Sequence, residues 1–336
     1  MADMPWPGAV GVSGGGDSLA LMHLLAGWAR TNQAAPPLVL CVDHGLRKQS
    51  AGEARAVARW AKKLGLKCEI LTVKTPKPRS DIEAWARAAR LSLMGARLVR
   101  HRLTTLYLAH HQDDQAETFL LRLARGSGLD GLAAMQRLAP FPHPAFGTLT
   151  LARPLLAVPR AALQDYLKAR GQDWLEDPMN NEARFARSRI RALLPQLAEA
   201  GLTARRIFDA AAHLARAREA LDLATAAVLA RALKRLEGGV LLLDPEALAA
   251  APREIGLRAL AGLLRTVSGA AYRPRFDALE SLFDRMAASG AQGSGLGGGV
   301  TLHGCRIGPA PVRYRPFGPN TLVITKESSR RGGAKA

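Results

Sequence analysis

The sequence predicts an α/β protein with a doubly wound, mostly parallel sheet, followed by a mainly helical C-terminal domain that carries a small β element. Short apolar runs alternate with longer helical patterns in the first part of the chain, as in strands joined by helices. A glycine-rich turn joins the first run to the first helix. From about residue 203 the chain is rich in Ala, Leu and Arg. The expected parts are therefore 1–200, 201–325 and a disordered basic tail at 326–336.

Composition narrows the class of protein. The chain has 336 residues, of which 48% are apolar, which is enough for two domains with a sizeable core. We expect a cytoplasmic protein without membrane association, because the sequence shows neither a membrane-length apolar run nor a signal peptide. Lys and Arg number 47 against 28 acidic residues, and the net charge of +19 favours a polyanionic partner such as RNA. The sequence does not indicate an oligomeric state.

The three cysteines are far apart in the sequence and form no C-x-x-C pair. This spacing predicts no disulfide partner and no zinc or iron–sulfur site. Cys41 and Cys68 lie in apolar runs that are typical of strands, so we expect buried, reduced thiols there.

The first predicted strand ends in Val10-Gly11-Val12 and leads through a glycine-rich turn into a helix. Consecutive glycines allow the backbone to approach a ligand closely, and the first N–H groups of a helix attract an anion. A Walker loop would need a Lys after the glycines, and a dinucleotide fingerprint would need Gly where Leu19 stands. The turn therefore predicts a nucleotide-phosphate loop of another kind, formed by Ser13, Gly14, Gly15, Gly16, Asp17 and Ser18.

The alternation then continues, and Asp43 and His44 directly follow the second strand. Ligands bind at the carboxyl ends of the strands in doubly wound sheets, so both residues are possible site residues beside the phosphate loop. Asp81 is predicted to cap the helix that it precedes. The predicted elements in this part are strands at 38–42, 68–73 and 103–109, with a helix at 81–100.

Histidines and acids gather directly after the fourth strand. Either Asp113 or Asp114 is predicted to cap the following helix, and Glu117 lies about one turn beyond Asp114 on the same face. A cap needs one acid and this stretch has three, so we interpret it as part of the site, with His110, His111 and Asp113 as possible participants.

Three later segments carry further predictions. The glycine-rich stretch 125–132 is typical of a loop that moves over a site, and 153–156 is predicted to form the last strand or an extended edge. Four arginines lie on a helix that is predicted to end at Pro195, and this pattern fits a solvated helix face as well as a contact with RNA or a triphosphate. These are Arg184, Arg187, Arg189 and Arg191.

The C-terminal predictions are helices within 203–236 and 252–286, a linker at 290–299 and strands at 300–302, 305–307 and 322–324.

Taken together, these motifs resemble the tRNA(Ile)-lysidine synthases, a family of PP-loop ATP pyrophosphatases. The resemblance covers roughly the first 195 residues, in the order of the family. This sequence departs from the family pattern at Ser188, where Asn is common, and at Leu91, where an aromatic residue is frequent. The matching segments are 13–18, 42–47, 111–118, 125–132, 153–156 and 174–195.

The resemblance implies an adenine nucleotide alpha hydrolase-like fold and a complete reaction. ATP, with Mg²⁺, would adenylate the C2 oxygen of the wobble cytidine in the CAU anticodon of tRNA(Ile), and L-lysine would then displace AMP. It also implies roles for individual residues. Ser13 to Ser18 would bind ATP, Asp17 would orient Mg²⁺, Asp114 and Glu117 would bind lysine, Arg90 and Arg187 would steady the triphosphate, and Arg191 is a further candidate.

Other functions remain open at this point. A PP-loop tRNA thiolase acting on an anticodon-region base would use a reactive cysteine or a C-x-x-C pair, and this sequence offers neither in a suitable place. A small-molecule amidotransferase of the same superfamily would not need the basic charge. A tRNA-binding protein without catalysis would not need both the glycine loop and the acidic stretch.

Overall fold

The computed structural model divides into two compact units, Met1–Arg216 and Ala217–Ala336. The division falls within helix α8 (Ala204–Ala232), whereas the boundary predicted from the sequence lies at 200. The predicted tail lies outside the described residues from 328 onward. The described residues are 4–45, 49–78, 80–176, 186–236, 240–270, 272–292, 296 and 298–327.

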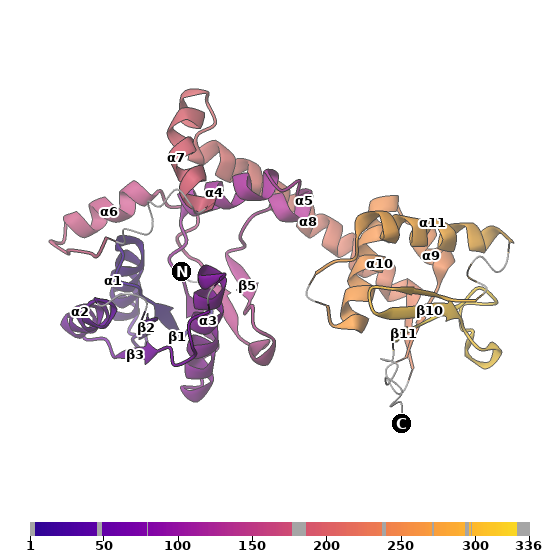
Figure 1. Cartoon of the computed structure of the whole chain (residues 1–336), viewed down its shortest axis with the longest axis horizontal. Helices are drawn as coiled ribbons and strands as arrows, with labels where there is room; N and C mark the ends of the chain where they lie inside the picture. The colour runs from indigo at the N-terminus through magenta and orange to yellow at the C-terminus, as the bar shows by residue number, and fades with distance from the viewer. Residues whose placement is uncertain are drawn as a thin grey trace. The chain divides into compact units, whose positions relative to one another are not determined.

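The first unit is built on a six-stranded sheet with the order β3-β2-β1-β4-β6-β5 (Figure 1). Its pairs are parallel except for β5, which runs antiparallel to β6. The chain moves from β1 outward to β2 and β3, then returns to place β4 on the other side of β1. The carboxyl ends of β1 and β4 therefore flank a topological switch point, where doubly wound sheets bind ligands. The strands are β1 (Gly8–Gly11), β2 (Leu38–Asp43), β3 (Cys68–Thr72), β4 (Thr105–Tyr107), β5 (Leu138–Pro140) and β6 (Thr150–Ala152).

Both faces of this sheet are buried, which confirms the doubly wound class. Alternate strand residues enter different cores: Val10 packs into the core with α1, α2 and α6, whereas its neighbour Ala9 packs into the core with α3. Figure 1 shows α1 and α3 on opposite sides of the sheet. The helices of this unit are α1 (Gly16–Thr31), α2 (Ser50–Lys63), α3 (Ile82–Arg100), α4 (Gln112–Leu123), α5 (Leu129–Leu132), α6 (Arg160–Lys168) and α7 (Ala186–Glu199), with a 3₁₀ turn at Pro144–Phe146.

Three local predictions in this unit were wrong. The last strand is not 153–156 but the preceding β6: the backbone N–H of Arg153 still bonds to Arg137 O (2.8 Å), but a turn begins at Pro154, which has no N–H to donate. Helix α7 continues through Pro195 for about one more turn, since a proline removes a single N–H donor. Asp81 occupies the N-cap position of α3, but its φ is 52° and its side chain accepts no capping bond.

The segment 125–132 is held against α4 in the structure. Gln115 and Arg122, seven residues apart on one face of α4, both bond to the backbone of this region. The Gln115 amide exchanges two bonds of 2.8 Å with the backbone of Met135, and Arg122 Nη1 donates to Gly131 O at 2.7 Å. The last part of the segment forms the short helix α5. Movement of this segment stays a prediction.

The second unit combines helices with an antiparallel sheet of order β7-β8-β11-β10-β9. Strands β7 and β8 were not predicted, because β7 directly follows helix α8 and both are only three residues long. None of the described helices could span a membrane. The elements are β7 (Leu233–Arg235), β8 (Leu241–Leu243), α9 (Pro245–Ala249), α10 (Arg253–Ser268), α11 (Phe276–Gln292), β9 (Val300–Leu302), β10 (Cys305–Pro309) and β11 (Leu322–Lys326), with a 3₁₀ turn at Val312–Tyr314.

Candidate functional site

The glycine loop lies at the switch point, between β1 and α1. Its serines brace it: Ser18 Oγ donates to Gly15 O at 2.8 Å, and Ser13 N donates to Ser18 Oγ at 3.2 Å. No side chain caps α1, because its N-cap is Gly15. Among the described residues, none accepts a hydrogen bond from the N–H groups of Gly16, Asp17 or Ser18. These donors lie at the positive end of the helix, which suits an anion such as phosphate.

A segment far along the chain lies against this loop, and its position was not predicted. The backbone N–H of Leu175 donates to Gly14 O at 2.9 Å. Gly14 has a φ of +93°, and a Cβ on it would lie 2.6 Å from Leu175 Cδ1. A Cβ on Gly16 would lie 3.4 Å from the indole of Trp174. Gly14 therefore serves both the turn and this close approach.

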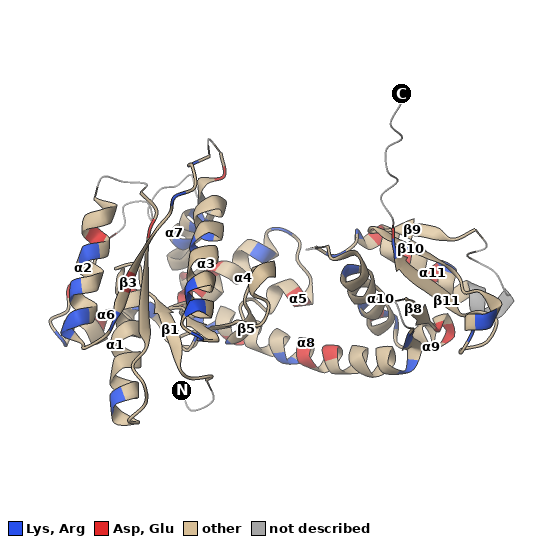
Figure 2. Ribbon diagram, turned by 90° about the horizontal axis from the view of Figure 1, so that it is seen from below, with Lys and Arg blue, Asp and Glu red and all other residues tan. Residues whose placement is uncertain are grey.

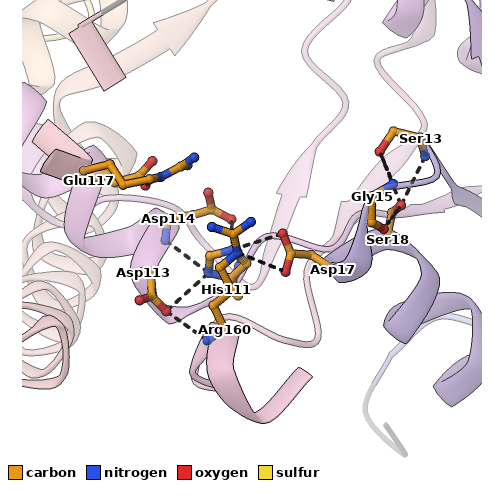
Figure 3. Close-up of polar contacts among 10 residues, drawn as sticks. Ser13, Gly15, Asp17, Ser18, His111, Asp113, Asp114, Glu117 and Arg160 are labelled. Atoms are coloured by element: carbon orange, nitrogen blue, oxygen red, sulfur yellow. Dashed lines mark hydrogen bonds and ion pairs between the residues drawn. The ribbon is translucent and has the colours of Figure 1, made fainter. Parts of the chain in front are cut away.

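Asp17 points from the start of α1 toward residues of α4 and α6 (Figure 3). Its Oδ2 lies 3.4 Å from His111 Nε2, and its Oδ1 lies 3.7 Å from Arg160 Nε. Asp17 Oδ1 is buried and has no hydrogen-bond partner among the described residues. A buried carboxylate oxygen without a partner is a suitable ligand for a cation.

Helix α4 begins at Gln112 with His111 at the N-cap position, so the prediction that Asp113 or Asp114 occupies that position was wrong. The Asp114 carboxylate accepts a bond from His111 N at 3.0 Å, as the N3 acid of a capping box does. Asp113 instead joins α4 to α6, because its Oδ2 accepts a bond from Arg160 N at 2.9 Å. The sequence could not show this, since the residue at the N-cap position is a histidine, which is not among the usual capping residues.

The His111 ring is surrounded by acids. Its Nδ1 lies 3.5 Å from Asp113 Oδ2 and 3.4 Å from Asp114 N, while its Nε2 lies 3.4 Å from Asp114 Oδ2. Burial alone would lower the pKa of His111, but Asp113, Asp17 and Asp114 together raise the pKa to about 10. The ring is therefore protonated near neutral pH, and Nδ1 donates to Asp113 rather than accepting from Asp114 N. Asp113 has a pKa lowered to about 2, mainly by its bond to His111.

These two pKa shifts predict how stability depends on pH in the metal-free protein. The pKa of His111 rises from 6.5 to about 10, so its contribution is complete below pH 6.5 and is lost as the pH rises to 10. The pKa of Asp113 falls from 3.8 to about 2, so its contribution is complete above pH 3.8 and is lost as the pH falls to 2. Each pKa unit corresponds to about 1.4 kcal/mol.

We therefore expect the free energy of unfolding, measured by urea titration, to decline by a few kcal/mol between neutral and strongly alkaline pH. The His111→Asn variant, which keeps a good capping residue but cannot be charged, should show a flatter alkaline decline. An alkaline decline of the same size in both proteins would show that His111 does not cause it.

Helix α7 brings two of the predicted arginines to α4. Arg191 Nε donates to Glu117 Oε1 at 2.7 Å, and Arg187 Nη2 donates to Thr118 Oγ1 at 3.5 Å. Glu117 is only 1% exposed, and its Oε2 has no hydrogen-bond partner among the described residues. Its carboxylate therefore keeps one oxygen available for a second cationic group.

A cluster of arginines forms the other part of the site. His110 follows β4 in the chain. Its pKa lies well below the usual value, first because the residue is buried and then because four positive charges lie near it. These charges belong to Arg153, Arg187, Arg87 and Arg90. Burial also lowers the pKa of His44, with Arg90 adding to the effect. The structure thus brings the candidates Arg90, Arg187, His44 and His110 into one electropositive region. Asp43 Oδ1 accepts a bond from Gly45 N at 2.9 Å, and the charge of Asp43 partly offsets the lowering of the His44 pKa.

The three cysteines are free thiols, and Cys41 and Cys305 are buried. Burial raises the pKa of Cys41 to about 12 and that of Cys68 to about 11. Neither is a ready nucleophile near neutral pH. In the part of the chain that the structure describes, no group of three or more His, Cys, Asp or Glu residues could hold a metal ion by itself.

The sequence of this chain is similar to those of a known domain family and of several known proteins. The PP-loop domain family matches residues 8–197. A tRNA(Ile)-lysidine synthase of Methylobacterium nodulans is 42% identical over 322 residues, covering 91% of this chain and 93% of that protein. One of Ruegeria pomeroyi is 45% identical over 266 residues, covering 79% of this chain and 62% of that protein. One of Wolbachia pipientis is 35% identical over 324 residues, covering 96% of this chain and 71% of that protein. The chain therefore spans less than two thirds of the Ruegeria relative.

The fold also resembles that of a solved structure, the U34-tRNA thiolase NcsA from Methanococcus maripaludis with its [4Fe-4S] cluster. The TM-score is 0.50 at 17% sequence identity, covering 64% of this chain and 70% of the thiolase. At this identity the similarity concerns the fold alone.

Proposed function

The chain belongs to the tRNA(Ile)-lysidine synthase family of PP-loop proteins, and on that basis we propose that it joins L-lysine to C2 of the wobble cytidine in the CAU anticodon of tRNA(Ile). The products are lysidine, AMP and pyrophosphate, and the modified anticodon reads AUA instead of AUG. One observation carries the proposal: a phosphate loop, buried acids and an arginine cluster meet at one switch point of the sheet.

The first half-reaction activates the base. The cytidine C2 oxygen attacks the α-phosphorus of ATP, the bond to the β-phosphate breaks, and pyrophosphate leaves. The free N–H groups at Gly16, Asp17 and Ser18 would hold the phosphates, while Arg90 and Arg187 offset their negative charge. Mg²⁺, which would be held by Asp17 together with phosphate oxygens, supplies further positive charge at the triphosphate.

The second half-reaction forms the carbon–nitrogen bond. The side-chain amine of lysine attacks C2, the C2–O bond breaks, and the original C2 oxygen leaves as part of AMP. A free lysine side chain has a pKa of about 10.4, so its ammonium group must lose a proton before the attack. Glu117 Oε2 would bind the ammonium group in a buried position, and Asp114 lies one turn away to complete the recognition.

The positive net charge of the protein supports an RNA substrate. We propose that the protein meets this substrate in the cytoplasm. Lys and Arg residues are conspicuous along α2 and α3 (Figure 2). Exposed members of this set are Arg55, Arg59, Lys62, Lys63, Arg87 and Arg100. Contacts of this kind with phosphates act through counterion release, so tRNA binding should weaken steeply with added salt.

The direct test is an assay with purified protein, ATP, Mg²⁺, labelled L-lysine and an isoleucine tRNA transcript with a CAU anticodon. We expect label in the RNA and one AMP for each lysine incorporated. A matched transcript with a different wobble base should take up none. Incorporation of sulfur or ammonia without lysine would contradict the proposal. The high pKa values of Cys41 and Cys68 argue against a thiolase that depends on these thiols.

A further inference from the structure

Arg153 makes a contact with His110 that the reaction scheme above leaves unexplained. Its Nε donates to His110 Nδ1 at 3.2 Å, and its Nη1 donates to Gln136 O at 2.8 Å. The arginine is buried, with 7% exposure, and its own backbone N–H bonds to Arg137 O at 2.8 Å. Bonds to the backbone of residues 136 and 137 therefore hold Arg153 in the position from which its Nε contacts the histidine.

The direction of the contact follows from chemistry. The Nε of arginine carries a hydrogen and has no lone pair to offer, so Arg153 can only donate. His110 Nδ1 must therefore accept, which means that it carries no proton. In a neutral imidazole the single proton then lies on Nε2.

The surroundings of His110 disfavour a second proton on the ring. The charged groups that face it come from three elements: Arg87 and Arg90 from α3, Arg153 from the end of β6, and Arg187 from α7. All are cations. Among the described residues, the groups with the largest effects on the pKa of His110 include no acid, in contrast to His111, whose pKa is raised by three acids.

We propose that Arg153 is a positioning residue that holds His110 as the neutral tautomer with its proton on Nε2, so that His110 acts as a hydrogen-bond donor in this site and not as a base. Nε2 has no hydrogen-bond partner among the described residues, and the ring is partly exposed. In an electropositive region such a donor suits an anionic oxygen, such as a phosphate oxygen of the nucleotide. It follows that the proton released by the lysine amine does not go to His110. This role rests on the proposed function, but the tautomer does not.

The test is nitrogen NMR of the full-length protein with ¹⁵N-labelled histidine, measured without substrates. Nitrogen shifts and long-range proton couplings distinguish a protonated from an unprotonated ring nitrogen. His110 is identified by the signal that is missing in H110Q. We expect one tautomer, with the proton on Nε2, and no titration between about pH 5 and pH 8.

Two variants at Arg153 complete this test. R153K can still donate to Nδ1 and should keep the single tautomer, whereas R153M should show both tautomers. A wild-type ring that is protonated on Nδ1, or an R153M spectrum identical to that of the wild type, would overturn the inference. If R153M does not fold, the wild-type and R153K spectra still decide.

Activity provides a second, separate readout. H110Q places an amide donor near the position of Nε2 and should keep the rate of AMP formation within a few-fold of the wild type. H110N, whose amide reaches only as far as Nδ1, should lose about 10²-fold, as when one donor to a developing charge is removed. Equal rates in the two variants would contradict the donor role. Absence of lysidine formation combined with the expected tautomer would refute the proposed function and leave the positioning role intact.

Discussion

Replacing Asp17 by asparagine should lower the rate of ATP-dependent AMP and pyrophosphate formation by about 10³-fold. Asp17 is the second residue of α1, beside the free N–H groups that we assign to the phosphates. Its Oδ1 is buried without a hydrogen-bond partner among the described residues, so the carboxylate is available to a cation that accompanies the triphosphate. Asparagine keeps the size of the side chain and removes this charge. Labelled ATP, with AMP and pyrophosphate separated by chromatography, measures the effect.

The matched control for this substitution is Asp165→Asn in α6. The Asp165 side chain is 72% exposed, and among the described residues it pairs only with Lys168. Asp165→Asn makes the same chemical change at a position away from the glycine loop, so it should leave the rate of AMP and pyrophosphate formation unchanged. Circular dichroism would check that Asp17→Asn is folded, because the loss of the contact with His111 costs some stability. A rate within tenfold of the wild type in a folded Asp17→Asn variant would contradict the assigned role.

Glu117→Gln should raise the KM for lysine by about 10²-fold before it affects the affinity for ATP. Loss of a hydrogen bond between charged groups in a buried position costs about 3 kcal/mol, which corresponds to this factor. Glu117 is 1% exposed, and its Oε2 is available because only Oε1 is bonded to Arg191. Initial rates of labelled lysine incorporation at saturating ATP and tRNA measure the KM.

A matched control is Glu219→Gln, because Glu219 is exposed on α8. This variant should show the wild-type KM for lysine. Binding of ATP alone, measured by calorimetry, should be similar in Glu117→Gln and the wild type. An equal loss of lysine and ATP affinity in Glu117→Gln would mean that Glu117 maintains the whole site through Arg191, and would contradict its assignment to lysine.

The sequence predicted the fold class because its signals are local. The apolar run before Ser13 and the polar residues after the fourth strand identify the two strand ends that form the switch point. The wrong prediction of the last strand concerns a feature that depends on distant contacts. Strand β6 is defined by its pairing with β4 and β5, and three-residue strands carry too short a pattern to be recognised.

The same distinction applies to the site. The residue types at 110–117 indicated a cluster, but not that a protonated His111 would lie among its acids, since Asp17 is far away in the sequence. The pairing of Glu117 with Arg191 joins residues separated by 74 positions. The position of Leu175 on the glycine loop likewise depends on the folded chain. These details decide which atoms remain available to substrates.

The acids of this site have cationic partners from other segments. Asp17 and Asp113 contact the His111 ring and residue 160, and Glu117 is paired with Arg191. The part of the site that contains Asp17, Asp113 and Glu117 is therefore close to electroneutral before any substrate arrives. Fields from exposed charges extend about 10 Å at moderate ionic strength, so an approaching RNA backbone experiences the arginine excess rather than the carboxylates. In the proposed reaction, this local charge compensation would let one small site attract a polyanion and still keep a carboxylate oxygen for the ammonium group of lysine.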